Sequence, residues 1–122
     1  FTFVLRPHGE TLPVAELYRM ARRVNGSFDY LADNCHSGKK QGTAFSMAST
    51  DQPEVAIMAV KKAEDDEDYI VRIVEQSGKD QHYCLNFLGV TYNLSIGRNE
   101  IQTLKINPIS KVIKQVNLLE FE

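Results

Sequence analysis

The sequence predicts an all-β protein, mainly an antiparallel β-sandwich, with one short helix near the N-terminus. From residue 42 onward, short apolar or alternating segments are separated by turn residues at fairly regular intervals. Only one segment, close to the N-terminus, carries apolar residues at helical spacing. The chain has 122 residues, 43% of them hydrophobic, which is enough apolar material for one core. We therefore expect residues 1–122 to form a single β-sandwich domain.

The N-terminal part is expected to contain a strand followed by the helix. Residues 1–5 alternate in the period of a strand. Thr11 is placed to cap the helix, and Pro13 suits its first turn. Asn25-Gly26 then ends the helix. The helix would place five apolar residues on one face, namely Val14, Leu17, Tyr18, Ala21 and Val24.

The rest of the chain, after turn-rich residues 28–41, is expected to form strands. The run at residues 55–60 is apolar on both faces, which suits a strand covered on both sides. The acidic run at residues 64–68 lacks the ligand alternation and central glycine of a calcium loop, so we expect a solvated hairpin tip. Asn107-Pro108 interrupts the ladder before the last strand. The expected strands are residues 42–49, 54–61, 69–75, 81–90, 91–96, 100–106 and 111–121.

Charge and composition exclude some classes of partner. The net charge of −2 argues against a nucleic-acid-binding protein, which usually carries a basic face. No apolar run approaches the roughly 20 residues that span a bilayer, so we expect no membrane partner. Cys35 and Cys84 could form one disulfide, but free thiols in a cytoplasmic protein are the favoured expectation. The chain begins at Phe1, within the first expected strand, which indicates a piece of a longer protein.

A metal site is the sharpest local alternative. Cys35-His36 and His82-x-Cys84 together supply the ligand inventory of a structural zinc site. However, adjacent residues on a strand point to opposite faces, and neither pair has a zinc-binding spacing. The sequence also contains no nucleophile elbow, phosphate loop or dinucleotide fingerprint. We therefore expect no catalytic, cofactor-binding or metal-binding residue in this chain.

Three polar residues are candidates for a substrate cleft or an interface: His8, Arg72 and Glu75. His8 lies at a strand-to-loop junction, where binding groups often lie, although an imidazole that stabilises the turn is the simpler interpretation. Arg72 lies in an otherwise apolar strand and needs an acidic partner, for which we expect Glu75 or Glu100. An ion pair at the sheet face is favoured over contact with a ligand.

Four segments that cover most of the chain occur in a recognisable order. The first ends in a Pro-His turn and precedes a short helix with Asn25 near its end. The second ends in paired lysines before an acidic turn, and the third carries Arg72, then Glu75 and a closing glycine. The fourth is the acid-aliphatic strand near the C-terminus. With these segments the chain resembles the C-terminal β-rich region of glycoside hydrolase family 38, the α-mannosidases. The segments are residues 1–9, 55–62, 68–78 and 100–106.

A further element departs from the family's order. Residues 117–120, Asn-Leu-Leu-Glu, resemble a family element that would more often precede the acid-aliphatic strand, whereas here they follow it.

The resemblance implies a role within a larger enzyme. Family 38 enzymes are retaining α-mannosidases whose N-terminal α/β domain carries a zinc ion and an aspartate nucleophile. Retention needs a nucleophilic carboxylate and an acid/base carboxylate about 5 Å apart. No stretch here matches the family's zinc or nucleophile motifs. The resemblance therefore implies a non-catalytic C-terminal sandwich with no cofactor of its own. This sandwich would pack on the zinc-containing catalytic domain of the same parent chain. It would meet the α-mannoside substrate only through that parent.

Two other interpretations remain. A free-standing carbohydrate-binding or protein-interaction sandwich would need an exposed aromatic platform, but the chain has no Trp and most of its Phe and Tyr residues fall at alternating strand positions. A complete small hydrolase is disfavoured because no acid/base constellation is visible. The mannosidase-domain hypothesis predicts instead a large apolar patch where the catalytic domain would dock.

Overall fold

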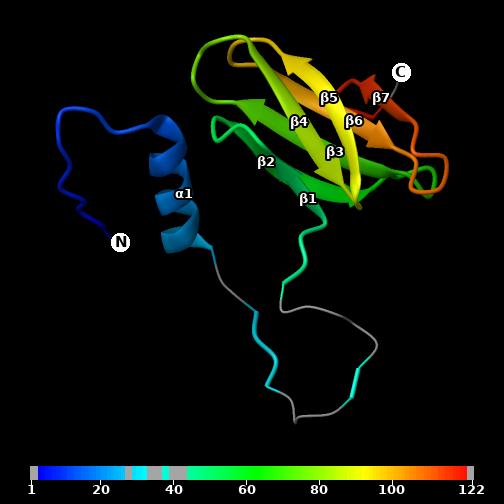
Figure 1. Cartoon of the computed structure of the whole chain (residues 1–122), viewed down its shortest axis with the longest axis horizontal. Coiled ribbons are helices and arrows are strands. Elements are labelled where there is room, and N and C mark those ends of the chain that lie inside the picture. Colours follow the sequence, from blue (N-terminus) through cyan, green and yellow to red (C-terminus); the bar gives the residue numbers. More distant parts are fainter. Residues whose placement is uncertain (1–2, 27–28, 33–36, 39–43, 121–122) are drawn as a thin grey trace. The chain divides into compact units, whose positions relative to one another are not determined.

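A computed structural model describes residues 3–26, 29–32, 37–38 and 44–120. Its contacts divide the chain into two compact units, residues 1–45 and residues 46–122. The first unit contains helix α1 (Val14–Asn25), and the second contains all the strands of the described residues (Figure 1). The expected fold class is confirmed, since the strands form two antiparallel sheets and the described residues hold one short helix near the N-terminus.

Helix α1 begins without a side-chain cap. Pro13 occupies the N-cap position with an extended backbone, and the cap has no side-chain hydrogen bond. The prediction that Thr11 caps the helix is therefore wrong. Glu16 in the first turn and Arg22 in the last turn suit the helix dipole, which favours anions at the N-terminus and cations at the C-terminus. The N–H of Gly26 donates to the carbonyl oxygen of Arg22 at 2.8 Å and closes the helix.

The predicted strand at residues 1–5 is wrong where the structure describes it. Residues 3–5 have no strand structure, and the side chains of Phe3 and Leu5 are exposed. A strand needs a neighbouring strand to pair its backbone groups, and within the described residues no strand pairs with this segment. Residues 1–2 lie outside the described residues.

The sandwich consists of two sheets, as Figure 1 shows. Sheet A has three strands in the order β1-β4-β5, and sheet B has four in the order β2-β3-β6-β7. All the paired strands run antiparallel. The strands are β1 (Ala48–Thr50), β2 (Val55–Lys62), β3 (Tyr69–Glu75), β4 (Gln81–Phe87), β5 (Val90–Ile96), β6 (Ile101–Ile106) and β7 (Ile113–Val116).

The core lies between the facing sides of the two sheets. Alternate residues of β3 and β4 point into it, because successive side chains of a strand point to opposite faces. The ring of Phe87 in sheet A meets the ring of Tyr69 in sheet B edge to face, with centroids 5.5 Å apart. The buried core residues are Val55, Val71, Ile73, Tyr83, Leu85, Phe87, Ile96, Leu104 and Ile106.

Strand β2 is not covered on both sides, contrary to the prediction. It forms an edge of sheet B, and its pairing with β3 is interrupted by a bulge between Ile57 and Ala59. Met58 is 45% exposed and Val60 is 37% exposed. The neighbouring strand β3 is the one that is buried, because β2 and β6 flank it.

The two strands predicted at residues 81–90 and 91–96 are present, but the first ends at Phe87, and a two-residue turn leads into the second, which begins at Val90. Phe87 pairs with Val90, and Leu88 and Gly89 between them have φ angles of 48° and 79°. Two positive φ angles define a type I′ hairpin turn. Such turns usually contain Asn or Asp before the glycine, so the Leu-Gly pair gave no clear turn signal.

The turns on either side of β3 and β6 are largely as expected. The acidic run is confirmed as the tip of the β2–β3 hairpin, where the N–H of Ala63 donates to the carbonyl oxygen of Asp68. The side-chain oxygen of Asn107 accepts bonds from the N–H groups of Ile109 and Ser110, so this residue does end the ladder.

The first and last predicted strands of the sandwich are shorter than expected. Of residues 42–49, only 48–49 belong to a strand, and residues 42–43 lie outside the described part. The last strand runs from Ile113 to Val116 rather than over residues 111–121, because the N–H of Leu119 turns back to the side chain of Asn117. Residue 121 is outside the described residues.

Candidate functional site

The three candidate residues belong to two different units of the structure. His8 lies in the first unit, exposed, and its ring nitrogen Nδ1 donates to the carbonyl oxygen of Gly9 at 2.7 Å. Arg72 and Glu75 both belong to β3, but an odd spacing places them on opposite faces of sheet B. The predicted pairing of Arg72 with Glu75 or Glu100 is therefore wrong.

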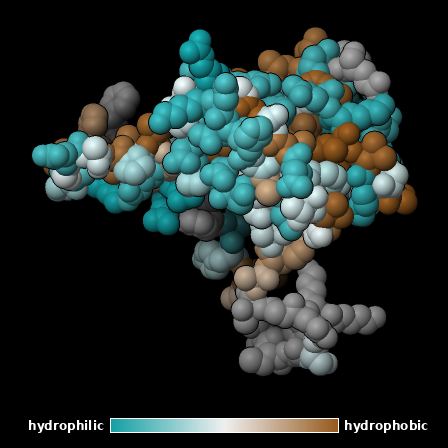
Figure 2. Space-filling model, turned by 45° about the horizontal axis from the view of Figure 1, so that its top comes forward, coloured by the Kyte–Doolittle hydropathy of each residue, from teal (hydrophilic) through white to brown (hydrophobic). Residues whose placement is uncertain are grey.

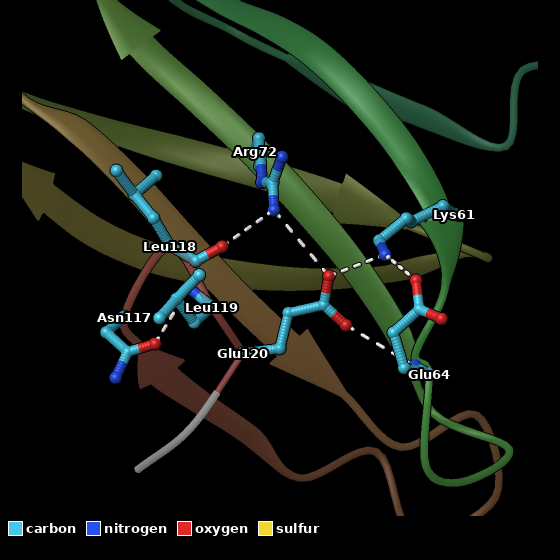
Figure 3. Close-up of polar contacts among 7 residues, drawn as sticks. All are labelled: Lys61, Glu64, Arg72, Asn117, Leu118, Leu119 and Glu120. Atoms are coloured by element: carbon cyan, nitrogen blue, oxygen red, sulfur yellow. Dashed lines mark hydrogen bonds and ion pairs between the residues drawn. The ribbon is translucent and has the colours of Figure 1, made fainter.

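Arg72 instead binds the segment that follows β7. Its Nη2 donates to the carbonyl oxygen of Leu118 at 2.9 Å and lies 3.6 Å from Oε1 of Glu120 (Figure 3). The Nε of Arg72 is buried and has no acceptor among the described residues. The acidic partner, Glu120, was not predictable from local sequence, because it lies 48 positions further along the chain.

Glu120 joins this segment to β2 as well as to β3. Its side chain is only 10% exposed, and Oε1 lies 2.6 Å from Nζ of Lys61. Its other oxygen accepts the N–H of Glu64 at 3.4 Å (Figure 3). The bond from Lys61 lowers the pKa of Glu120, and the same bond, with help from Glu64, raises the pKa of Lys61. We call residues 117–120 the C-terminal strap, since these contacts hold it against β2 and β3.

Glu75 lies at the end of β3 on the inner face and is 1% exposed. Its carboxylate accepts four hydrogen bonds, from the N–H and hydroxyl of Ser77 and from the N–H groups of Gly78 and Asn99. Glu75 thus fastens the β3–β4 turn to the β5–β6 turn. Burial alone would raise the pKa of Glu75, but the bonds from Ser77, Asn99 and Gly78 together outweigh it and lower the pKa to about 2. This carboxylate remains ionised at neutral pH.

A polar network lies between the sheets on the side of β5 and β7. The hydroxyl of Tyr83 donates to Oε1 of Gln102 at 2.5 Å, and Nε2 of Gln102 donates to Oε1 of Gln115 at 3.1 Å. Nε2 of Gln115 then donates to Oε1 of Glu100 at 3.3 Å. Burial, and to a lesser degree the charge of Glu100, raises the pKa of Tyr83, so its phenol stays a donor.

This network borders an open cavity of about 590 Å³, to which β4, β5, β6 and β7 all contribute. Sequence reasoning missed the cavity because its lining comes from four strands, and the glutamines carry no motif. Its polar walls include His82, Cys84, Asn93, Ser95, Gln102 and Gln115.

The structure describes half of the zinc constellation considered from sequence. His82 and Cys84 lie on the same face of β4, while Cys35 and His36 lie outside the described residues. The Sγ of Cys84 donates to Oδ1 of Asn93 at 3.1 Å. Burial raises the pKa of Cys84, and nearby Asp51 adds to this. Within the described residues, no group of three or more His, Cys, Asp or Glu side chains is arranged to hold a metal ion.

The helix of the described residues is too short and too polar to cross a membrane.

Comparison with known proteins identifies the sandwich. The family model described as the glycosyl hydrolases family 38 C-terminal beta sandwich domain matches residues 54–122. The match runs from the residue before β2 through β7 and the C-terminal strap. No curated protein and no solved structure gives a significant match. Because the matched part is more than half of the chain, the chain belongs to the family of glycosyl hydrolase family 38 C-terminal β-sandwich domains.

Proposed function

We propose that this chain is a non-catalytic C-terminal domain of a larger α-mannosidase. In this proposal the sandwich packs on a zinc-dependent catalytic domain of the same parent chain, which hydrolyses α-mannosides with retention. The observation that carries the proposal is the family match, which coincides with β2–β7 and therefore with most of the folded sandwich. The chain's contribution would be structural: it supports the catalytic domain and helps to shape the substrate cleft.

The state of the enclosed carboxylates supports a non-catalytic role. A retaining glycosidase uses one carboxylate as nucleophile and one carboxylic acid, with a raised pKa, as proton donor. Glu75 and Glu120 both have a lowered pKa instead, and hydrogen bonds from neighbouring turns and ion pairs occupy their oxygens. Such groups act as anchors of the fold. We therefore assign the catalytic carboxylates and the zinc ligands to the parent's catalytic domain.

Exposed apolar side chains support packing on a further domain. Ile109 is 89% exposed in the turn between β6 and β7, and Leu119 is 75% exposed in the C-terminal strap. Figure 2 shows patches of hydrophobic side chains among the polar ones on the sandwich. Interfaces between domains of one chain bury such side chains. Arg72 binds the C-terminal strap, which contains the exposed Leu118 and Leu119, and for this reason it is an interface candidate. The large exposed apolar residues of the sandwich are Met58, Val60, Ile101, Ile109, Val112, Leu118 and Leu119.

The proposal is tested by comparing the hydrolysis of an aryl α-mannoside by this chain and by the full-length parent. We expect activity in the parent, loss of that activity with a chelator, and its return when zinc is added. The 122-residue chain is expected to be inactive with or without zinc. An aryl α-glucoside serves as the matched control for substrate specificity.

Two results would contradict the proposal. Hydrolysis by this chain alone would place catalytic groups within it. An inactive parent that still binds mannose-containing glycans would favour a carbohydrate-binding module.

A further inference from the structure

Within the described residues the sandwich has four edge strands, and three of them carry features that hinder pairing with other strands. Natural edge strands are protected by shortness, by lysines, by prolines or by bulges. In sheet A, β1 has only three residues. In sheet B, β7 has four and contains Lys114, while β2 carries the bulge between Ile57 and Ala59 and ends in Lys61-Lys62. These three edges are poor templates for a further strand.

The fourth edge, β5, has none of these features. It is seven residues long, from Val90 to Ile96, and contains no charged residue and no proline. Its pairing with β4 continues without a bulge from one end to the other. Among the described residues, no strand pairs with its other side. By the usual rules, such an edge is an open template for strand addition.

The hairpin turn determines which groups the edge presents. A two-residue turn makes the flanking residues, Phe87 and Val90, a hydrogen-bonded pair. Since hydrogen-bonded and non-hydrogen-bonded pairs alternate in an antiparallel ladder, the N–H and C=O groups of Thr91, Asn93 and Ser95 point away from β4. The carbonyl oxygen of Ser95 indeed accepts a bond at 3.2 Å from Nε2 of Gln102, which lies outside the β4–β5 pair.

Space is available beside this edge. The cavity of about 590 Å³ is lined by Asn93, Leu94 and Ser95, and a neighbouring one of about 540 Å³ is lined by Ser95 and Ile96. Both cavities are also bordered by Gln115 of β7 in the opposite sheet. The described sandwich therefore leaves room beside residues 93–96 of β5 for another extended chain.

We propose that β5 pairs with β5 of a second copy of this chain, in antiparallel register about a two-fold axis at Asn93. In this register Asn93 lies opposite its own copy, Thr91 opposite Ser95, Tyr92 opposite Leu94, and Val90 opposite Ile96. The two three-stranded sheets then join into one sheet of six strands. Both chains use the same surface patch, as a closed two-fold dimer requires.

The side chains of β5 favour a second copy over another partner. About Asn93 the strand is close to a palindrome in chemical character: the exposed positions 91, 93 and 95 are small and polar, and the remaining positions are apolar or aromatic. Every cross-strand pair in the proposed register thus joins like with like, and no charges oppose each other. The competing occupant is an extended segment of the parent enzyme.

The test measures the mass of the chain in solution by light scattering and sedimentation, in the presence of a reductant that excludes disulfide-linked dimers. We expect a concentration-dependent species of twice the 13.8 kDa chain mass. Asn93→Lys and Asn93→Glu each place two like charges on the two-fold axis, so each variant alone is expected to be monomeric. An equimolar mixture of the two variants pairs opposite charges and is expected to restore the dimer.

Ser49→Lys is the matched control. Ser49 is also exposed, but it lies in β1 at the opposite edge of sheet A, so this variant should dimerise like the wild type. Circular dichroism spectra equal to the wild type establish that the variants are folded. The same measurements on the parent should give a dimer that Asn93→Lys abolishes.

Three results would overturn the proposal: a wild-type chain that is monomeric up to its solubility limit, a charge-paired mixture that stays monomeric, and a monomeric parent. The last result would favour the competing occupant, an extended segment of the parent.

Discussion

Replacing Glu75 with glutamine is expected to lower the free energy of unfolding at pH 7 by about 2 to 3 kcal/mol. The glutamine side chain has one acceptor oxygen where the carboxylate has two, so its amide group would face N–H donors from the turns. The β3–β4 and β5–β6 turns would then lose part of their shared anchor. Urea denaturation followed by circular dichroism measures the change.

The same carboxylate predicts a pH dependence. The pKa of Glu75 is lowered from an ordinary value of 4.5 to about 2 in the folded chain, so its stabilising effect is complete above pH 4.5 and is lost as the pH falls toward 2. The wild type should therefore lose stability in this range, and the Glu75→Gln variant should lose less. Asp65→Asn, in the exposed hairpin tip, should change stability by less than about 0.5 kcal/mol at pH 7. Parallel pH curves for wild type and Glu75→Gln would contradict this account.

Replacing Phe87 with alanine is expected to lower the free energy of unfolding by about 3 to 5 kcal/mol. Phe87 is 1% exposed, and its ring in sheet A packs edge to face on Tyr69 in sheet B. The substitution removes this contact and leaves a cavity between the sheets. Because domains of this size are stable by only about 5 to 15 kcal/mol, we expect a large fall in the urea midpoint.

Ile109→Ala is the control, because it removes apolar side-chain volume from the surface and leaves the core unchanged. Ile109 is 89% exposed, so its truncation should change stability by less than about 0.5 kcal/mol in the isolated chain. Equal effects of the two substitutions would show that the two sheets do not share the core described here.

The bounds of a strand were predicted well where its own buried residues determine them. They were predicted less well where they depend on contacts with distant segments. Strand β3 coincides with the prediction for residues 69–75, because a dense β-branched run between an acidic turn and Ser77-Gly78 has few alternatives. The edges were less predictable. The apolar run of β2 could not reveal that this strand ends the sheet, since edge position depends on how distant strands are ordered.

The role of His8, Arg72 and Glu75 in a cleft or interface stays a prediction, and the contacts of Arg72 were predicted incorrectly. The expectation that Arg72 needs an acidic partner is met, yet the partner is Glu120 rather than Glu75 or Glu100. Reading residues 111–121 as one strand hid this contact, because only the turn at Asn117 brings the strap back to β3. Glu75 was chosen as an interface or cleft candidate, and its four bonds to two turns depend on tertiary structure that no local pattern encodes.

The central claim, that this sandwich packs on a mannosidase catalytic domain and supports it, is tested most directly by complementation. The 122-residue chain is titrated into a parent that lacks these residues, and hydrolysis of an aryl α-mannoside is followed during the titration. Our account predicts low activity in the truncated parent and a saturable rise toward the full-length value as the chain is added. A truncated parent that is fully active, and that does not respond to the chain, would contradict it.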